Sequence, residues 1–366
     1  MSHEFPPFIG GVGTVGAQLA SDLVSRGIHV EVMTRTQTDR LSVPDVTFHD
    51  VDIVPKFWHR SYGRALGRLN LDDYDLVILN EAAPTIVAGK YFTEAQLKKC
   101  LVLLHGLEIE NIYAWSIRNL ARRLAGFTSA HARAVRGAGV TAAVSEDMRQ
   151  KFLEACRIDP APNIEVVYMG VDHQRFFTED SNYRQINGFD TDDCLMVTGS
   201  RITREKGLAD MLDAFNEMAA RIPSLRWIIC GDGDYLPQMK QEVETRGLSN
   251  LIRFEGYCDT HRLRHIYNSC DLFWLISHYR EAFPLVYIEA QLTGLPVIGR
   301  DLGGVREAIL PGNGWLVSNA ADALTAVQDY VNGPRMHRDE VSGRAAIMQS
   351  RHTLQSLADR ITHARL

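Results

Sequence analysis

The sequence predicts an α/β protein made of two Rossmann-like domains that face a central cleft. Three observations lead to this prediction. The length of 366 residues is typical of two domains. Short apolar strands alternate with amphipathic helices, as in parallel sheets that helices cover on both faces. The alternation pauses once, in the polar segment 172–193, which we interpret as a linker between the domains.

The individual elements follow from the apolar runs and their breaks. The first helix is expected from Val15 to a stop at Gly27. Strands are expected at 28–34, 76–80, 100–106, 139–145, 164–168, 194–200, 226–233, 252–256, 271–277 and 295–299. The stretch from Met336 has a helical pattern. We therefore assign residues 1–175 to an N-terminal domain and 176–366 to a C-terminal domain whose last helix could cross back to the first.

Composition narrows the class of protein. The hydrophobic share of 45% and the charged share of 23% are ordinary for a soluble globular chain, and no apolar run reaches membrane-spanning length. The six cysteines are scattered without a C-x-x-C pair, which favours reduced thiols in a cytoplasmic protein. The net charge of −6 argues against nucleic acid as a partner.

Near its start the chain carries a G-x-G-x-x-G pattern at Gly11, Gly13 and Gly16. A dinucleotide site needs a strand before such glycines and an acidic residue at the end of the next strand. Only "MSHEFPPF" precedes them, and the next predicted strand is followed by Arg35. An NADP-dependent oxidoreductase that uses Arg35 for the 2′-phosphate therefore remains an alternative function. The glycines also allow backbone or ligand to approach a helix start.

The window "SHYREAFPLVYIEAQLTGLPVIG" (277–299) predicts a binding site at the start of a helix. Pro284 fits the first helical turn, and Gly294 stops the helix. Glu281 lies in the loop before this helix and Glu289 lies two turns along it. A helix N-terminus attracts anions, and the two carboxylates suit hydroxyl groups of a sugar and a ribose.

The window "VTGSRITREKGLADMLDAF" (197–215) places two cations beside a strand end. A strand ends at Gly199, and Arg201 and Lys206 follow on the loop to the next helix. Ligands of open α/β sheets bind at the carboxyl ends of the strands. The two cations could neutralise a diphosphate and the charge that develops on a leaving phosphate.

Together these motifs resemble those of the family-4 retaining glycosyltransferases, which have the GT-B fold of two Rossmann domains. The resemblance covers nearly the whole chain and depends on the order and spacing of several motifs. They are "EFPPFIGGVGTVGAQLASDLVSRGIHVEVMTR" at the start, "LLHG" (103–106), "TAAVSEDMRQKF" (141–152), "YMGVDHQRF" (168–176), "GSRITREKG" (199–207), Glu281-x7-Glu289 and "DLGGVREAI" (301–309).

The resemblance implies a function and a set of site residues. The protein would move a sugar from a nucleotide-diphosphate donor to an acceptor such as a lipid-linked sugar or a polysaccharide precursor. The residues implied for donor binding are Gly10, Gly11, Arg201, Lys206, Glu281, Ala282, Phe283, Leu285 and Glu289. His105, Arg201, Lys206 and Glu281 would be the catalytic residues.

The resemblance also implies what each group does. A loop at Gly10 and Gly11 would let donor and acceptor approach, so the G-x-G-x-x-G match would be incidental. His105 would contact the transferred sugar near its anomeric carbon. Arg201 and Lys206 would hold the diphosphate. Glu281 would bind sugar hydroxyls, helped by the amides of Ala282 and Phe283, Glu289 would bind the ribose, and "EGYCDT" (255–260) would lie near the base.

The implied reaction retains the anomeric configuration. The sequence offers no convincing nucleophile for a double displacement, and the front-face mechanism proposed for such enzymes needs none. Arg201 and Lys206 would stabilise the leaving phosphate while it takes the acceptor's proton. No metal and no cofactor is expected. The aspartates of "DVD" (50–52) and "GDGD" (231–234) are interpreted as strand-end and turn residues.

Two features depart from the family pattern. The family usually begins with a strand before "EFPP", so either the true start lies upstream or the first sheet lacks its central strand. The family often has Gly-Phe-Gly after the first glutamate, whereas this chain has Ala282-Phe283-Pro284. Pro284 removes one donor amide, so the identity of the sugar is not predicted.

Two stretches of the N-terminal domain, on the side where the acceptor is expected, contain basic residues and no acidic ones. The stretch 111–145 holds five arginines and no acidic residue, and 53–71 is likewise basic and free of acidic residues. In helical projection Tyr113, Ile117, Leu120, Leu124 and Phe127 form one stripe, expected to pack, with Trp115, Arg118 and Arg122 opposite. An interfacial helix at 111–136 would attach the protein to an anionic membrane on its inner face. A solvated basic helix is the alternative, as is a non-catalytic partner subunit for the function as a whole.

Overall fold

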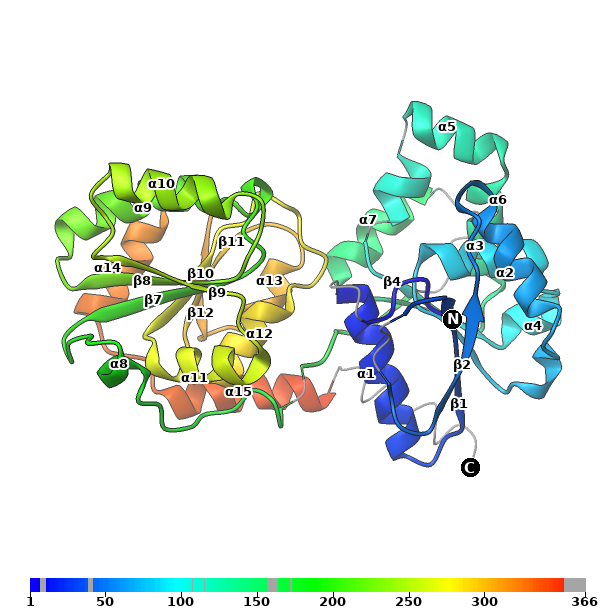
Figure 1. Ribbon diagram of the computed structural model, residues 1–366, viewed down its shortest axis with the longest axis horizontal. Helices are drawn as coiled ribbons and strands as arrows, with labels where there is room; N and C mark the ends of the chain where they lie inside the picture. The colour runs from blue at the N-terminus through cyan, green and yellow to red at the C-terminus, as the bar shows by residue number, and fades with distance from the viewer. Residues whose placement is uncertain are drawn as a thin grey trace. The chain divides into compact units, whose positions relative to one another are not determined.

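The computed structural model describes residues 1–6, 11–38, 42–106, 108–114, 116–156, 164–171 and 173–351. The chain forms two compact units, an N-terminal unit (Met1–Met169) and a C-terminal unit (Gly170–Arg351) (Figure 1). The expectation of a last helix that crosses back concerns residues 352–366, which lie outside the described residues. Both units are parallel α/β structures, so the predicted fold class is confirmed.

The N-terminal unit contains two groups of parallel strands. Strands β1 (Val30–Arg35) and β2 (Val46–Val51) form one pair. The other group runs in the order β3-β4-β5-β6, with bounds Val77–Leu79, Cys100–Leu104, Val140–Ala143 and Ile164–Val166. Strand β4 is buried at every position, as expected for a parallel strand covered on both faces.

Between these two groups lie the first residues of the chain. The amino group of Met1 donates to the carbonyl of Ile78 at 2.7 Å, and the amide of Asn80 donates to the carbonyl of Met1 at 3.1 Å. On the other side, the amide of Ser2 donates to the carbonyl of Met33 at 3.0 Å. No described residue forms a strand between β1 and β3, and these backbone hydrogen bonds of Met1 and Ser2 link the two groups of strands.

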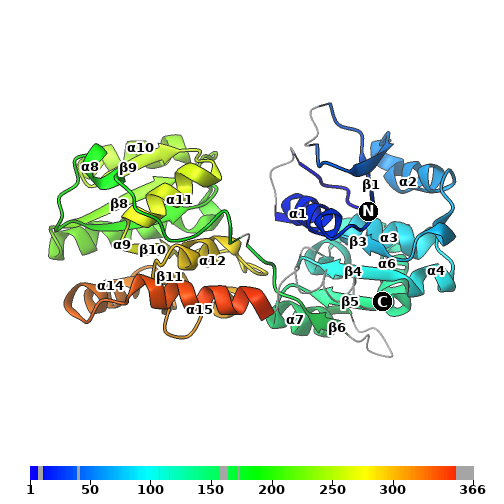
Figure 2. The same cartoon turned by 90° about the horizontal axis from the view of Figure 1, so that it is seen from below.

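Helices cover the sheets of the N-terminal unit. Those in the described residues are α1 (Gly11–Ser25), α2 (Trp58–Leu66), α3 (Ala82–Tyr91), α4 (Glu94–Lys98), α5 (Ile117–Leu124), α6 (Phe127–Gly137) and α7 (Glu146–Cys156). Helices α3 and α6 pack side by side (Figure 2). Gly89 allows this contact, because a Cβ there would fall 1.8 Å from the carbonyl oxygen of Ala130.

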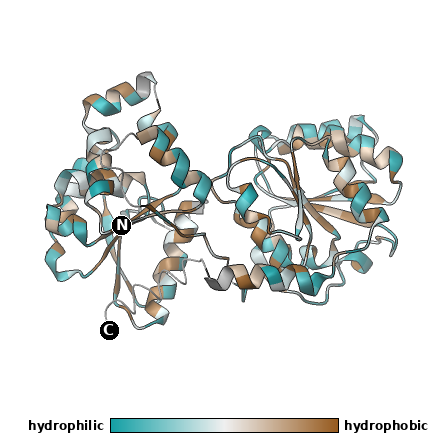
Figure 3. Ribbon diagram, turned by 180° about the vertical axis from the view of Figure 1, so that it is seen from behind, coloured by the Kyte–Doolittle hydropathy of each residue, from teal (hydrophilic) through white to brown (hydrophobic). Residues whose placement is uncertain are grey.

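The C-terminal unit has one parallel sheet in the order β12-β11-β10-β7-β8-β9. Its strands are β7 (Cys194–Gly199), β8 (Leu225–Cys230), β9 (Ile252–Gly256), β10 (Leu272–Leu275), β11 (Val297–Arg300) and β12 (Gly314–Val317). Figure 3 shows the hydrophobic residues gathered along these strands. Trp227 on β8 and Trp274 on β10 are fully buried in this core, with ring centroids 4.8 Å apart.

Helices lie on both faces of this sheet (Figure 1). One face carries α9 (Leu208–Arg221), α10 (Leu236–Thr245) and α14 (Ala323–Asn332). The other carries α11 (Thr260–Ser269), α12 (Leu285–Leu292), α13 (Val305–Ala308) and α15 (Arg338–Arg351). The chain leaves β7 in one direction and β10 in the other, so the strand order reverses between these neighbours. Such a reversal is where open α/β sheets bind ligands.

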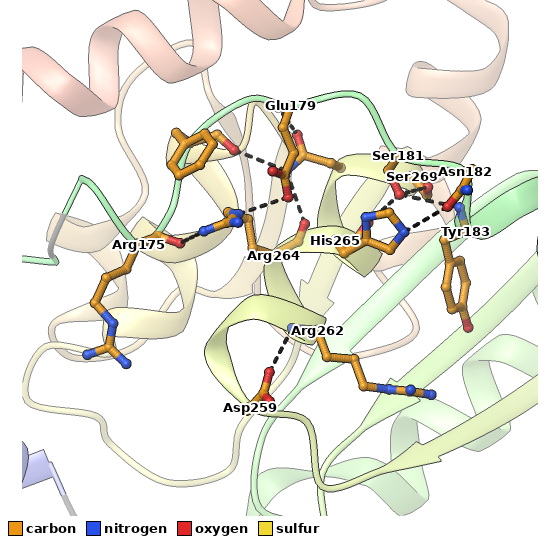
Figure 4. A network of polar contacts seen from close by, with 12 residues as sticks. Arg175, Glu179, Ser181, Asn182, Tyr183, Asp259, Arg262, Arg264, His265 and Ser269 are labelled. Atoms are coloured by element: carbon orange, nitrogen blue, oxygen red, sulfur yellow. Dashed lines mark hydrogen bonds and ion pairs between the residues drawn. The ribbon is translucent and has the colours of Figure 1, made fainter.

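The segment interpreted as a linker is fixed to the C-terminal unit over much of its described length. It contains the short helix α8 (Tyr183–Ile186). Arg264 on α11 contacts it twice, donating to the backbone carbonyl of Arg175 at 3.0 Å and to the carboxylate of Glu179 at 2.8 Å (Figure 4). The hydroxyl of Ser181 donates to the carbonyl of His265 at 2.7 Å. These contacts tie the polar segment to one face of α11.

The predicted strands are confirmed, with shifts of a few residues at their ends. Among the described residues, two strands were not predicted. Both β2 and β12 lie at sheet edges and are short or largely polar, so they carry a weak apolar signal. The prediction for α1 was wrong at its start, because the helix begins at Gly11 rather than Val15.

Candidate active site

Two loops meet at the reversal point of the C-terminal sheet. One follows β7 and carries Arg201 and Lys206, and the other follows β10 and carries Glu281. The amide of His278 donates to the carbonyl of Glu205 at 3.0 Å, which fastens the loops to each other. The sheet topology therefore places three residues that lie up to 80 positions apart in the sequence on two loops that contact each other.

Lys206 and Glu281 form an ion pair at this point. The Nζ atom of Lys206 lies 2.5 Å from Oε1 of Glu281, and the two side chains are only 19% and 17% exposed. The same carboxylate oxygen accepts a hydrogen bond from the hydroxyl of Ser277 at 3.2 Å. Both charged groups are therefore held in fixed positions while a part of each still reaches the surface.

Glycines make the close packing of these loops possible. Gly207 has φ = 74°, and a Cβ there would lie 2.2 Å from the carbonyl oxygen of Ile276. Gly304 donates its amide to the carbonyl of Glu281 at 2.8 Å, and a Cβ there would lie 1.8 Å from the carbonyl oxygen of Ala282. The motif "DLGGVREAI" thus supports the backbone that carries Glu281.

Glu289 lies on α12, as predicted, and is partly buried. Burial raises the pKa of its carboxyl from 4.5 to about 7, while the positive charge of Arg175 acts in the opposite direction. Its carboxylate forms no hydrogen bond with another described residue. The hydroxyl of Tyr267, whose pKa is raised by burial and then by the charge of Glu289, is also without a partner among the described residues. A partly buried carboxylate that forms no hydrogen bond with a described residue is available to accept hydrogen bonds from a ligand.

The remaining predicted donor residues surround this site. The side chain of Arg201 is exposed and forms no hydrogen bond with another described residue. Ala282 and Phe283 lie in the loop after Glu281, and Leu285 is the first residue of α12. Pro284 is the N-cap of α12, and Gly294, with φ = 79°, follows its C-cap, so the predicted helix limits are confirmed.

Arg175 was missed by the sequence analysis as a member of this site. Its guanidinium donates to the hydroxyl of Thr260 at 2.7 Å, at the first turn of α11, and its charge acts on Glu289. Figure 4 shows Arg175 on the segment that runs along α11. Its place in the quoted motif "YMGVDHQRF" was the only signal in the sequence.

The strand ends of the N-terminal unit gather a second group of polar side chains. His105 follows β4, as predicted, and its Nε2 lies 3.2 Å from Oδ1 of Asn80, which follows β3. Glu108 is buried and accepts the amides of His105 and Gly106 at 3.2 and 2.6 Å. Burial raises the pKa of Glu81 to about 7, although it accepts two backbone amides.

Asn80, Glu81 and Glu108 were also missed. A usable signal existed for the first two, since both directly follow the apolar run "LVIL", as His105 follows "LVLL". Glu108 gave no such signal, because its role depends on a turn at Gly106 with φ = 114°.

The glycines of the G-x-G-x-x-G pattern belong to α1. Gly10 lies outside the described residues, and Gly11 is the first helical residue rather than part of a loop, which corrects the prediction. Gly16 has a packing role, because a Cβ there would lie 2.9 Å from Nδ2 of Asn80. Helices tolerate glycine in their first turn, where backbone amides lack partners in any case.

Two of the D-x-D aspartates, Asp52 and Asp232, form local hydrogen bonds. Asp52 accepts the hydroxyl of Thr36 at 2.7 Å, just after β2, and Asp232 accepts the amide of Gly233 at 2.7 Å in the turn after β8. Both bonds are those of a strand-end or turn residue.

The predicted interfacial helix is not one helix. A π-helical turn (Ile109–Tyr113) precedes α5, and α6 follows after a break at Gly126. Leu120 and Leu124 are 51% and 83% exposed, so the expectation that they pack was wrong. Arg122 instead turns back to the carbonyl of Asn111. Trp115 and the side chains of Ile117 and Arg118 lie outside the described part.

The π-helical turn explains why the leucines of α5 are exposed. Arg123 donates to the carbonyl of Tyr113 at 2.7 Å, and Asn119 donates to the carbonyls of Glu110 and Ala114, both at 2.7 Å. Asn119 is buried while it makes these bonds, whereas Arg123 stays exposed, so Asn119 rather than the leucines is the α5 side chain that turns toward the interior. No helix among the described residues is long and apolar enough to cross a membrane.

With the site described, comparison with known families identifies the class of protein. A model for "Glycosyltransferase Family 4" matches residues 9–175, and one for "Glycosyl transferases group 1" matches residues 179–341. The chain belongs to the family-4 glycosyltransferases, as its motifs predicted, and it is a glycosyltransferase. Because the chain belongs to this family, the alternative function of an NADP-dependent oxidoreductase is rejected.

Curated relatives fit this class. The chain is 25% identical over 337 residues to an N-acetyl-alpha-D-glucosaminyl L-malate synthase of Bacillus anthracis, covering 88% of this chain and 84% of the relative. It is 27% identical over 274 residues to a GDP-mannose-dependent alpha-(1-6)-phosphatidylinositol monomannoside mannosyltransferase of Mycolicibacterium smegmatis, covering 72% and 69%.

Solved structures share the GT-B fold. Anabaena Alr3699/HepE in complex with UDP superposes with a TM-score of 0.76 at 18% identity, covering 99% of this chain and 97% of that chain. Sucrose-phosphate synthase from Thermosynechococcus elongatus gives a TM-score of 0.76 at 19% identity, covering 100% and 96%.

Proposed function

We propose that this glycosyltransferase takes its sugar from a nucleotide-diphosphate donor bound at the reversal point of the C-terminal sheet. The observation that carries the proposal is the Lys206–Glu281 pair at 2.5 Å, with Glu281 in the loop before α12, the helix that also carries the carboxylate of Glu289. Lys206 and Arg201 supply positive charge for a diphosphate, Glu281 accepts sugar hydroxyls and Glu289 accepts ribose hydroxyls. Relatives named for N-acetylglucosaminyl and GDP-mannose chemistry, and a fold relative solved with UDP, support this class of donor.

The transfer is proposed to retain the anomeric configuration without a metal. Lys206 and Arg201 stabilise charge on the departing phosphate oxygen, and that oxygen takes the proton of the acceptor hydroxyl on the same face of the sugar. The cations perform the electrostatic task that a divalent ion performs in other transferases. The amides of Ala282 and Phe283 and the start of α12 add positive potential.

The acceptor is proposed to be a lipid-linked sugar or a polysaccharide precursor, reached from an anionic membrane surface in the cytoplasm. The support is the basic, apolar surface of the N-terminal unit. Leu120 and Leu124 on α5 are exposed, and so is Phe57 at 50%. Trp58 packs on Phe127 with ring centroids 5.6 Å apart, which joins the start of α2 to the start of α6. The two stretches free of acidic residues therefore meet.

A donor screen tests this proposal. The protein is incubated in excess EDTA with UDP-glucose, UDP-N-acetylglucosamine or GDP-mannose, and release of the nucleotide is measured with and without acceptor lipids. We expect release from one donor, with the anomeric carbon retaining its configuration by NMR. Activity that vanishes with EDTA and returns with Mg²⁺ or Mn²⁺ would contradict the metal-independent reaction. Failure with every donor would point to a non-catalytic partner subunit.

A further inference from the structure

Asn80 lies between three parts of the N-terminal unit. It directly follows β3, and its side chain is buried. Its Nδ2 donates to the hydroxyl of Ser2 at 3.0 Å and to the backbone carbonyl of Val12 at 2.9 Å. Its Oδ1 faces Nε2 of His105 at 3.2 Å. One amide group therefore connects the chain start, α1 and the end of β4.

The contact with Val12 decides which way this amide points. A backbone carbonyl oxygen only accepts hydrogen bonds, so the NH2 group of Asn80 must face it. The oxygen of the amide then faces His105. Because an amide oxygen also only accepts, the Nε2 atom of His105 must carry a hydrogen.

His105 carries only that one ring hydrogen near neutral pH. Burial lowers the pKa of its imidazole from 6.5 to about 4, so the ring is neutral. A neutral imidazole with a hydrogen on Nε2 has a lone pair on Nδ1. No described residue donates a hydrogen bond to this Nδ1, so the lone pair is available to a ligand.

The backbone at His105 is fixed as well. Glu108 accepts the amides of His105 and Gly106, and Gly106 has φ = 114°, a conformation that favours glycine. Backbone and ring are therefore held from two directions, by Glu108 and by Asn80. Nδ1 is the ring nitrogen that these contacts leave free.

We propose that Asn80 is a positioning residue that fixes His105 in its Nε2–H tautomer, so that Nδ1 accepts a hydrogen bond from a hydroxyl group of the substrate sugar. The role toward the sugar rests on the proposed function, in which His105 contacts the sugar. In this arrangement His105 selects for a hydroxyl at the facing position, since a deoxy or fluoro group cannot donate. The ring does not act as a cationic donor near neutral pH.

The direct test is ¹⁵N NMR of the full-length protein labelled at histidine, with the His105 signals assigned from the His105→Gln variant. Long-range ¹H–¹⁵N spectra distinguish the two neutral tautomers and the doubly protonated ring. We expect the Nε2–H tautomer in the wild-type protein, unchanged from pH 6 to pH 8. An Nδ1–H tautomer or a doubly protonated ring at pH 7 would overturn the proposal, whatever donor the enzyme uses.

Variants add a second measurement. Asn80→Ala should yield mixed tautomers, and Asn80→Asp should raise the pKa of His105 into the titratable range, because a carboxylate favours the imidazolium. The exposed Asn332 provides the control Asn332→Asp, which adds the same charge in the other unit and should leave His105 unchanged.

Kinetics separate positioning from a merely structural role. With the donor found in the screen, Asn80→Ala and His105→Ala should each lower kcat/KM at least tenfold, and the double variant should lose little more than either single one. If the loss in the double variant equalled the sum of the two single losses, the proposal that Asn80 acts by positioning His105 would be contradicted. If no donor is turned over, the proposed function fails while the tautomer measurement still decides the assignment of His105.

Discussion

The polar groups of the two units are arranged in opposite ways. At the reversal point of the C-terminal sheet, Lys206 and Glu281 satisfy each other, and Glu289 has no hydrogen-bond partner among the described residues. At the strand ends of the N-terminal unit, Asn80 and Glu108 are buried and hydrogen-bonded to fixed backbone groups. The first arrangement can exchange its internal contacts for a charged ligand. The second holds one ring in one orientation and gives a ligand a single acceptor atom.

The largest effect is expected at the Lys206–Glu281 pair. Lys206→Ala and Glu281→Ala should each reduce kcat/KM by about 10²–10³, or roughly 2–4 kcal/mol, because a charge-assisted contact to the reacting groups is lost. Lys240→Ala, the other lysine of the C-terminal unit, is the matched control and should stay near wild type. Near-normal turnover by either site variant would remove that residue from the site.

A second effect concerns stability and pH at Glu289. A carboxyl whose pKa rises from 4.5 to about 7 on folding holds its proton more tightly in the folded state. Its contribution to stability is therefore fully present below pH 4.5 and is lost as the pH rises through about 7. Glu289→Gln, which stays neutral, should be more stable than wild type by about 2–3 kcal/mol at pH 8 and little different at pH 5. Urea unfolding at both pH values measures this, and equal stabilities at pH 8 would contradict the burial of a charge.

A third effect concerns the close packing of Gly304 against the loop that carries Glu281. In Gly304→Ala the new Cβ would fall 1.8 Å from the carbonyl oxygen of Ala282, so the loop must move. We expect a loss of about 1–3 kcal/mol in stability and roughly a tenfold loss in kcat/KM, because Glu281 is displaced. Gly343→Ala on α15, where a Cβ meets nothing within 4 Å, should be neutral or slightly stabilising. An active, fully stable Gly304→Ala enzyme would show that the loop does not depend on this contact.

The smallest effect is expected at the membrane surface. The double variant Leu120→Ser, Leu124→Ser should bind vesicles of anionic lipid about tenfold more weakly, roughly 1.4 kcal/mol, because exposed apolar side chains no longer insert. Ile186→Ser, at an isoleucine 71% exposed in the other unit, is the control. Co-sedimentation at low and high salt measures the binding, and high salt should weaken it. If wild-type protein ignores anionic vesicles, the acceptor is to be sought among soluble molecules.

The sequence analysis named more of the polar residues that the structure places together in the C-terminal unit than in the N-terminal unit, for a physical reason. Arg201, Lys206 and Glu281 lie on loops after strands that are apolar and buried at every position, so the apolar runs and the spacing after them placed these residues. The unpaired state of Glu289 and the influence of Arg175 on it depend on tertiary packing that no local pattern contains. The same holds for the contact between Asn80 and His105.

Helix α5 shows where local patterning was misleading. Its leucines and arginines separate into two faces, and the ordinary expectation is that the leucines pack. Asn119 and Arg123 donate to backbone carbonyls of the π-helical turn before α5, and Asn119, rather than the leucines, turns toward the interior. A sequence pattern shows that a helix has two faces, but hydrogen bonds to nearby backbone groups can decide which one turns inward.

The central claim, that the C-terminal unit holds a nucleotide-sugar site built around Glu289, is tested most directly by proton-linked calorimetry. UDP-glucose, UDP-N-acetylglucosamine and GDP-mannose are titrated into the protein at pH 7 with EDTA, in buffers of different ionisation enthalpy. Ribose hydroxyls that donate to Glu289 favour its ionised form. In the protein without ligand the pKa of Glu289 is about 7, so at pH 7 about half of the molecules carry a proton on this carboxyl. Binding of one donor should therefore release about half a proton. Glu289→Gln should bind more weakly and release no proton. Binding by Glu289→Gln with the affinity and proton release of the wild-type protein, or no binding of any donor to the wild-type protein, would contradict the claim.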